Sequence, residues 1–365
     1  MRLPLLVMAC AASLAADPLG FSPGTEPVVI DTSNPDAWVS ASACAACHPT
    51  EYAQWSQSRH HTSWTNNLMQ AGFVVEPLTF CITCHAPSPP QIAEVMANLE
   101  AYRQLGPHGT QSHQALQPIL PEPHAAEGIT CATCHLREGK ILTATPEEKL
   151  PYWAPHDFIS QPDAGGVTAC ASCHEFQIPV MVDGALRLTE NLMQSTVTEW
   201  RAWQARTGST KTCQDCHMPD GDHTMPGGHD RQRVRDALLV DVVGSPATTI
   251  TLTARGTGHA LPTGDLFRNL TLEVRPRPNA DWTVLERFGR TFAIENDDGI
   301  PTKRPATDTR LRPGEPRHVA IPAAFRRGDW RVVMHLGSTH DEQRQWVPEE
   351  ELVYVIHNGS LIALP

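Results

Sequence analysis

The sequence predicts an α+β protein in which a mostly irregular and α-helical domain is followed by an antiparallel, β-sandwich-like domain. Ten of the 11 cysteines lie between residues 44 and 216, and none follows. From about residue 231 onward, short runs alternate apolar and polar residues, which is typical of strands. Proline (32) and glycine (24) are frequent, so much of the chain must form turns and irregular segments.

Periodicity places the individual elements. Residues 89–105 and 191–205 have apolar side chains at helical spacing, so we expect helices there that pack against the core. The strand-like runs lie at residues 247–255, 269–277, 317–323, 329–337 and 351–357. Five to seven such strands in about 130 residues favour a sandwich over residues 231–365. The acidic stretch 295–299 is interpreted as a solvated turn rather than a calcium site.

The N-terminus has the features of an export signal. Arg2 precedes an apolar run over residues 3–16 that ends in small residues. We therefore expect residues 1–16 to be a signal peptide and the mature protein to be periplasmic or otherwise extracytoplasmic. An alternative is a lipoprotein anchored through Cys10, and both interpretations export the protein.

Charge and hydropathy exclude two classes of protein. The formal net charge of −12 argues against a nucleic-acid-binding protein, which would present a basic face. No apolar run after residue 20 is long enough to span a membrane. We therefore expect no nucleic-acid partner and no membrane span in the mature chain.

One pattern, Cys-x-x-Cys followed at once by histidine, occurs five times. The copies are Cys44/Cys47/His48, Cys81/Cys84/His85, Cys131/Cys134/His135, Cys170/Cys173/His174 and Cys213/Cys216/His217. A disulfide framework gives no reason for a histidine after every pair. Zinc sites join two Cys-x-x-Cys halves, and five halves cannot pair evenly. A redox dithiol would need one or two copies.

Covalent haem explains every feature of the pattern. Residues three apart share one face of a helical turn, so both thiols can reach the vinyl groups on one edge of a porphyrin. The following histidine then becomes an axial iron ligand. The sequence therefore predicts five haem c groups. Successive motifs are separated by 37, 50, 39 and 43 residues, too few for five independent folds, so we expect one pentahaem domain over residues 17–230.

Each iron has a second axial position, and thirteen histidines remain to fill five such positions. The predicted second ligands are His60, His124, His156, His229 and His259, with His61 as the alternative to His60 and His223 as the alternative to His229. His108 and His113, in a polar loop that contains glycine, are weaker candidates. Met218 and Met225 are also possible ligands, and a methionine would raise the reduction potential.

His259 is the boldest of these predictions because it lies 42 residues beyond His217, inside the predicted β domain. Gly258, Pro262 and Gly264 around it favour a sharp turn and a close backbone approach to a bulky group. An iron bond to His259 would join the two domains. The alternative is a strand-connecting turn with an exposed histidine.

The stretch CAACHPTEYAQWSQSRHHTS resembles the first haem segment of cytochrome c554-type multihaem proteins. In that family a tryptophan, a serine and a distal histidine follow the haem motif, and they correspond here to Trp55, Ser58 and His60. CITCHAP and EGITCATCH are similar to later haem segments. CQDCHMPDGDHTMPGGHD followed by GHALPTGDLFRNLTLEV resembles exported bacterial multihaem cytochromes with a C-terminal β domain.

The resemblance covers roughly residues 40–275 and implies electron transfer between periplasmic or outer-surface partners. Expected partners are redox proteins, with a membrane quinol-linked complex or an outer-membrane cytochrome complex as candidates. The fifth motif and the long tail depart from the four-haem pattern. Because some relatives reduce small nitrogen or sulfur compounds, a reductase with one open iron is the alternative. The chain has no Cys-x-x-Cys-Lys motif, a common mark of such reductases, and this favours the carrier.

Overall fold

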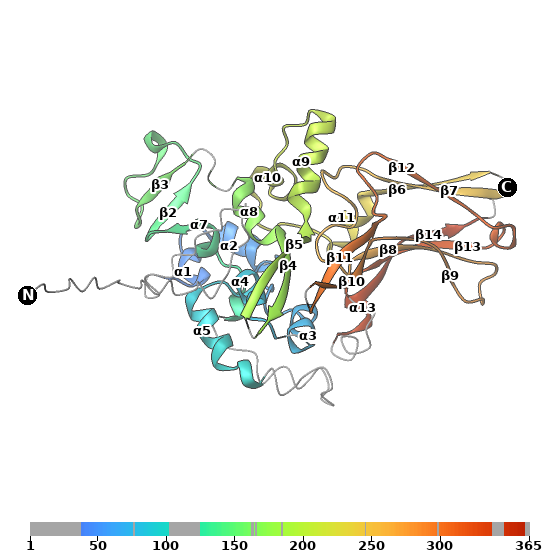
Figure 1. The fold of residues 1–365 in the computed structure, drawn as a ribbon. Helices are drawn as coiled ribbons and strands as arrows, with labels where there is room; N and C mark the ends of the chain where they lie inside the picture. Colours follow the sequence, from blue (N-terminus) through green and yellow to red (C-terminus); the bar gives the residue numbers. More distant parts are fainter. Residues whose placement is uncertain are drawn as a thin grey trace, which may run out of the picture.

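The computed structural model describes residues 38–75, 77–101, 125–161, 164, 166–183, 185–244, 246–297, 299–337 and 347–361. Helices dominate the N-terminal part and strands the C-terminal part, which lie side by side in an elongated molecule (Figure 1). The predicted α+β class is therefore confirmed. The predicted signal peptide, Cys10, His108, His113 and His124 lie outside the described residues.

The N-terminal part is built from short helices separated by turns. Its α-helices are α1 (Ala41–Ala45), α2 (Pro49–Ser56), α3 (Asn67–Val75), α4 (Thr79–His85), α5 (Pro89–Ala97), α7 (Cys131–His135), α8 (Val167–His174), α9 (Thr196–Thr207) and α10 (Cys213–His217). Single 3₁₀ turns are η3 (Ala125–Glu127), η4 (Glu147–Lys149) and η5 (Pro219–Gly221). Helix α5 begins at Pro89 because the Ser88 hydroxyl accepts from the Gln91 backbone N–H and the Gln91 side chain accepts from that of Ser88.

Two small sheets accompany these helices. Strands β1 (Leu136–Arg137), β2 (Lys140–Thr143) and β3 (Phe158–Ser160) form one, and β4 (Glu175–Val182) and β5 (Ala185–Ser195) form a hairpin. The helix expected over residues 191–205 therefore begins only at Thr196. The structure makes residues 191–195 the end of β5, because cross-strand pairing with β4 outweighs their helical periodicity.

The C-terminal part is a sandwich of two antiparallel sheets. The first has the order β12-β7-β6 and the second β14-β13-β8-β9. The bounds are β6 (Leu238–Gly244), β7 (Ala247–Ala254), β8 (Asn269–Arg275), β9 (Thr283–Phe288), β12 (Pro316–Ala320), β13 (Asp329–His335) and β14 (Val353–Ser360). Helix α11 (Arg231–Asp236) precedes it, and η6 (Ala323–Phe325) and α13 (Glu349–Leu352) lie within it.

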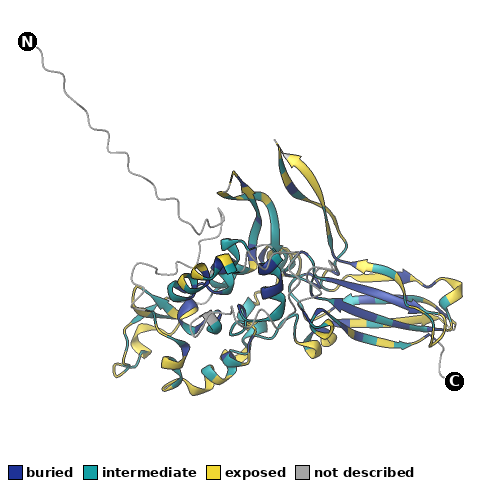
Figure 2. Cartoon of the chain, turned by 90° about the horizontal axis from the view of Figure 1, so that it is seen from below, coloured by how far each residue is buried: buried dark blue, intermediate teal, exposed yellow. Residues whose placement is uncertain are grey.

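The two sheets share one apolar core. Ile250 and Leu252 from β7 pack in the same cluster as Leu272 from β8, Val332 from β13 and Ile356 from β14. Alternate residues of β7 are buried, as expected for a strand with one inward face, whereas the central strand β8 is buried along almost its whole length. Figure 2 shows this as dark strands inside a lighter rim.

A further hairpin, β10 (Arg290–Asp297) and β11 (Ile300–Asp308), leaves the sandwich. It contacts the β4–β5 hairpin, and both project from the same side of the molecule (Figure 2). The acidic stretch 295–299 belongs to the end of this hairpin. None of the helices in the described part of the chain is long and apolar enough to cross a membrane.

The sandwich core generates a stability prediction. Ile250 is fully buried and Ile294 is 74% exposed. We expect Ile250→Ala to lower the free energy of unfolding by about 2–5 kcal/mol, because it removes buried methyl groups and leaves a cavity. The matched control Ile294→Ala should change it by less than about 0.5 kcal/mol. Denaturant titrations followed by circular dichroism compare the two, and equal effects would contradict this account of the core.

Candidate haem-binding site

Four of the five cysteine–histidine motifs end an α-helix. Helices α4, α7, α8 and α10 all end at the histidine of their motif, so the two cysteines and the histidine follow one turn in the same order. Thr212 stabilises the start of α10: its hydroxyl accepts from the Asp215 backbone N–H at 3.3 Å, and the Asp215 carboxylate accepts from the Thr212 N–H at 2.7 Å. None of the ten motif cysteines forms a disulfide among the described residues, so each sulfur can be attached to a porphyrin.

The first motif departs from this pattern at Cys47. Helix α1 ends at Ala45, so Cys47 lies beyond it in a turn, where its backbone N–H donates to the Cys44 carbonyl at 3.1 Å. The helix stops because the residue before a proline avoids the helical conformation, and His48, which precedes Pro49, has φ −120° and ψ 55°. Cys47 is exposed, whereas Cys44 is half-buried. The His48 N–H donates to the Cys44 carbonyl at 2.9 Å, so both thiols of this motif still lie on one helical turn.

Thiols of different motifs lie next to one another. Cys44 and Cys131, Cys84 and Cys173, and Cys170 and Cys213 each influence the pKa of the other thiol. In each pair this interaction, together with burial, raises the pKa of one thiol, as it does for Cys131 next to Cys44. These contacts join motif 1 to motif 3, motif 2 to motif 4, and motif 4 to motif 5, and Cys134 of motif 3 interacts electrostatically with Cys173 of motif 4. The motifs are therefore packed in one cluster, in accord with a shared core.

Cys47 and Cys216 take no part in these contacts. The three thiol pairs named above, within the described ranges, consist of other cysteines. Cys216 is half-buried, and its backbone carbonyl accepts from Arg233 Nη2 at 2.5 Å, which ties motif 5 to α11. The prediction that Cys47 and Cys216 each hold a haem therefore rests on the motif and not on the surroundings of their side chains.

Three histidine pairs face each other at nearly the same separation. The ring centres are 6.2 Å apart for His60 and His174, 6.3 Å for His135 and His223, and 6.1 Å for His217 and His259. A metal ion bound at about 2 Å by the facing nitrogens of two imidazoles sets their ring centres about 6 Å apart. Each pair joins a motif histidine to one from outside the motifs, so the residues fit an iron with two axial imidazoles.

Hydrogen bonds fix the orientation of these rings. The Nδ1 atom lies within hydrogen-bond distance of a backbone carbonyl in His85 (Ser63, 3.0 Å), His135 (Leu142, 3.2 Å), His217 (Pro226, 2.8 Å), His223 (Gly221, 2.7 Å) and His259 (Ala260, 3.0 Å). A proton donated from Nδ1 leaves Nε2 as the free lone pair, which is the usual arrangement around a metal-bound histidine.

His60 is held differently, because its Nδ1 lies 2.9 Å from the Met225 sulfur. Met225, one of the two methionines considered as iron ligands, thus contacts a candidate ligand. Burial above all, together with the neighbouring His217 and His85, lowers the pKa of His60 to about 4. The imidazole is therefore neutral at physiological pH, and this is the form that binds a metal.

The structure places the neighbouring candidates differently. His60 rather than His61 faces a motif histidine, whereas the His61 ring packs on Trp55 with centres 4.5 Å apart. His223 rather than His229 faces His135. Its neighbour Asp222 accepts from the Thr224 backbone N–H at 2.8 Å, which stabilises the turn that carries the ring.

Other predicted ligands have different surroundings. His156 packs edge-on against Phe158 at 4.7 Å, and its Nδ1 atom is buried without a partner. His229 Nε2 lies 3.4 Å from Arg268 Nη2. In the part of the chain that the structure describes, no comparable ring pair includes His48 or His85. His124 lies outside the described residues, so its role stays a prediction.

The turn around residues 60–63 joins three motifs. Ser63 donates from its hydroxyl to the His85 carbonyl at 2.8 Å, and the same oxygen accepts from the Ile129 N–H at 3.1 Å. Gly128, which precedes the third motif, has a φ of +60° and packs against this turn; a Cβ there would come within 2.6 Å of the His60 carbonyl oxygen. Only glycine suits both conditions.

His259 lies in a loop of residues 258–268 that connects β7 to β8 and reaches the helical part (Figure 1). A Cβ at Gly258 would come within 3.1 Å of the Trp203 ring on α9, so the loop backbone lies directly against that helix. Gly264 has a φ of +95°. The glycines around His259 thus permit the close approach and the sharp turn that the sequence suggested.

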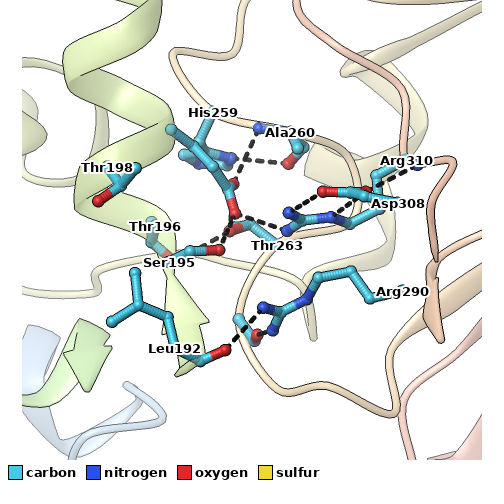
Figure 3. Close-up of polar contacts among 12 residues, drawn as sticks. Leu192, Ser195, Thr196, Thr198, His259, Ala260, Thr263, Arg290, Asp308 and Arg310 are labelled. Atoms are coloured by element: carbon cyan, nitrogen blue, oxygen red, sulfur yellow. Dashed lines mark hydrogen bonds and ion pairs between the residues drawn. The ribbon is translucent and has the colours of Figure 1, made fainter. Parts of the chain in front are cut away.

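The Glu199 carboxylate, from the helical part, holds this loop. Figure 3 shows Ala260, Thr263 and Arg310 at this junction. Glu199 on α9 accepts from the Ala260 backbone N–H at 3.1 Å and from the Thr263 hydroxyl at 2.8 Å, so it binds both sides of the turn after His259. Its other oxygen accepts from Arg310 at 2.6 Å and from the Ser195 hydroxyl at 2.6 Å. The Glu199 and Arg310 side chains are only 12% and 6% exposed.

Two arginines complete the junction. Arg310 also forms an ion pair with Asp308 at 2.7 Å, and this raises the pKa of the guanidinium. Arg290 donates to the carbonyls of Leu192 (3.2 Å), Met193 and Gly264 (3.3 Å), so β10 is tied both to the end of β5 and to the loop. The position of the His259 ring therefore depends on bonds from both parts of the molecule.

Sequence reasoning missed Glu199, Arg290, Arg310 and Arg268. Of these, only Arg268 had a visible signal, since an arginine in the apolar run LFRNLTL at the start of a strand requires a partner. The β4–β5 hairpin, which sequence reasoning also missed, had a visible signal as well, because Asp-Gly between two apolar runs favours a tight hairpin. Asp183 has the left-handed φ of 51° that this turn type needs.

Residues 36–230 match a family described as outer membrane cytochrome MtrC/MtrF-like, domains II/IV. The chain belongs to this family. It is therefore a multihaem c-type cytochrome, and haem c is its cofactor. The assignment to the cytochrome c554 type in particular stays a prediction. No match was found among curated proteins.

The cytochrome also resembles a solved structure, a penta-heme cytochrome c552 from Thermochromatium tepidum. The TM-score is 0.59 with 20% sequence identity, and the match covers 91% of this chain and 99% of that one. The likeness includes most of both parts of the cytochrome, so the arrangement of a helical and a β-rich part in one chain is shared.

The Glu199 contacts generate a prediction. Glu199→Gln should lower the free energy of unfolding by about 1.5–3 kcal/mol, because charge-assisted hydrogen bonds in a buried place are lost. It should also speed proteolysis of the 258–268 loop. The matched control is Glu315→Gln, since Glu315 forms an exposed ion pair at 3.9 Å with Arg206 of the same helix. That change should cost less than about 1 kcal/mol. Equal effects in denaturant titration would show that Glu199 does not hold the junction.

Proposed function

We propose that the protein is an exported electron carrier that transfers electrons between redox partners through five covalently bound haems. The observation that carries the proposal is the set of three facing histidine pairs with ring centres 6.1–6.3 Å apart. Two imidazoles on an iron leave no position for a substrate, so such a haem exchanges electrons and does not bind small molecules. The bound haems supply the redox chemistry, and the chain supplies their ligands and spacing.

The proposed ligand sets follow from these pairs. His60 would serve the haem of motif 4, His223 that of motif 3 and His259 that of motif 5. His223 thus replaces His229 in the proposed set. The second ligands of the haems at His48 and His85 are left to the remaining candidates, among which are His124 and His156. All ten motif cysteines, Cys47 and Cys216 included, would hold these haems through thioether bonds.

The thiol contacts support an order of electron transfer. Motif 1 neighbours motif 3 through Cys44 and Cys131, and motif 4 neighbours both motif 2 and motif 5. Cys134 of motif 3 also interacts electrostatically with Cys173 of motif 4. The haems would accordingly form a path 1–3–4–5, with haem 2 joined at haem 4. Electrons would enter and leave at the ends of this branched path.

The location and partners are proposed on the family and the N-terminal sequence. The family name refers to outer-membrane cytochromes, and residues 1–16 have the pattern of an export signal. Both agree with an extracytoplasmic protein whose partners are redox proteins, such as an outer-membrane cytochrome complex or a quinol-linked membrane complex.

Intact mass and electron paramagnetic resonance test the function together. The mature protein should carry the mass of five haems, and the oxidised protein should show only low-spin ferric signals. Nitrite or hydroxylamine should then leave the visible spectrum unchanged. Four haems or fewer would contradict the stoichiometry. A stoichiometric high-spin signal that responds to one of these ligands would replace the carrier by a reductase.

The reductase is the second candidate, and one observation favours it. The His85 ring lies near the charged groups of Asp265 and Arg268, and both affect its pKa, although burial lowers that pKa most. A cationic side chain close to a haem can hold an anionic substrate such as nitrite or a sulfur oxyanion. On this interpretation the haem of motif 2 would keep an open position.

His259→Ala tests the ligand that would join the two domains. One haem should become high-spin or take water, its reduction potential should rise, and the β domain should become easier to cleave by protease. The control is His318→Ala on β12, an exposed histidine beside the Thr251 hydroxyl, which should alter none of these. Five unchanged low-spin haems in the His259 variant would mean that the domains are held by packing and by the Glu199 contacts alone.

A further inference from the structure

Arg268 is a cation placed among the candidate haem ligands without a matching anion. It is the last residue of the loop that carries His259, directly before β8. Its positive charge acts on His85, His174 and His229, and the charge of Arg59 adds to it at His229. Among the described residues no carboxylate lies within ion-pair distance of Arg268.

The hydrogen bonds of Arg268 are too few and too long for a guanidinium. Nη1 donates to the Thr263 carbonyl at 3.3 Å, and Nη2 lies 3.4 Å from His229 Nε2. The Nε atom is buried and has no partner. A guanidinium has five N–H donors in a planar fork that suits two carboxylate oxygens. Removing such a cation from water is unfavourable unless an anion accompanies it.

The backbone around Arg268 is shaped to admit the guanidinium. Gly264 would place a Cβ 2.8 Å from Nη1, and Gly228 would place one 3.4 Å from the same atom. A glycine from the helical part and one from the loop therefore line its two sides. Asp265 lies close enough to affect the charge of Arg268, but it accepts a hydrogen bond from the Phe267 backbone N–H at 3.0 Å. Tyr354 donates its hydroxyl proton to the Gly228 carbonyl at 2.8 Å, so it supplies no anion.

We propose that Arg268 binds a propionate carboxylate of a haem attached at motif 2 or motif 4. This inference rests on the proposed haem loading and adds a partner for the cofactor. The β domain then contributes two groups to the haem cluster from one loop, an imidazole at His259 and a guanidinium at Arg268. The propionate supplies the anion that the described protein residues do not, and the guanidinium favours the reduced state of that haem.

The test compares Arg268→Gln with Arg268→Lys and with Arg317→Gln, an exposed arginine of the same domain that pairs with Glu286 at 3.1 Å. In the glutamine variant the potential of one or two haems should fall, because the lost positive charge no longer opposes the ferric state. The propionate bending band in the resonance Raman spectrum should shift. Lysine keeps the charge without the fork, so it should restore the potential and leave the band shifted. Arg317→Gln should match the wild type.

Two controls separate the possible failures. The first control is intact mass, which must show five haems in every variant. A wild-type protein with fewer than five haems would contradict the proposed function but not this inference. Five haems with unchanged potentials and an unchanged band in Arg268→Gln would overturn the inference alone. Nitrite and sulfite added to the wild type form the second control. A stoichiometric spectral response that disappears in Arg268→Gln would show that the guanidinium binds a free oxyanion, which also overturns it.

Discussion

The separation of facing imidazoles, close to 6 Å between ring centres, is the constraint on which the rest of the structure depends. An iron with two axial histidines tolerates little variation in this distance, so both rings of each pair must be fixed from outside. Helices that end at the motif histidine fix one ring. Backbone carbonyls that accept from Nδ1 fix the rotation of most of the rings. The short helices and frequent turns of the N-terminal part serve this purpose, since a long helix could not place so many rings in a small volume.

The junction between the two parts shows the same constraint at longer range. His259 comes from the loop before β8, and its ring lies next to that of His217 at the end of α10. Glu199 on α9 binds the turn that follows His259 and so holds the ring in place. The Glu199 carboxylate forms an ion pair with Arg310, and Arg310 forms a second ion pair with Asp308. A nearly buried carboxylate and guanidinium would be costly if either stood alone. Together they hold the loop that carries His259 against α9.

Much of the fold and of the candidate site could be predicted from the sequence, because these features have local sequence patterns. Most of the motif turns, the β-rich tail and the turn around His259 follow from spacing and residue type. That His223 rather than His229 lies opposite His135 could not be predicted, because both lie in one glycine-rich stretch. The Gln54 side chain on α2 accepts from the His223 N–H at 3.0 Å, a contact between distant parts of the chain that no local pattern reveals. Nor could the role of Glu199 be found, since the partners that it holds across the junction, Ala260, Thr263 and Arg310, lie more than 60 residues away in the chain. Residues 191–195 have a helical period, and only their pairing with β4 reveals a strand.

The loop of residues 258–268 leaves one sheet at β7 and enters the other at β8, and this has a consequence for biogenesis. Its shape is defined only when both sheets exist, and the second sheet includes β14, close to the C-terminus. The ring opposite His217 therefore reaches its place only after β14 has been made, although its partner motif precedes that strand by more than 100 residues in the chain. A truncated chain can carry every cysteine–histidine motif and still lack this geometry. The coordination state of a single iron would then act as a checkpoint, telling finished molecules from incomplete ones.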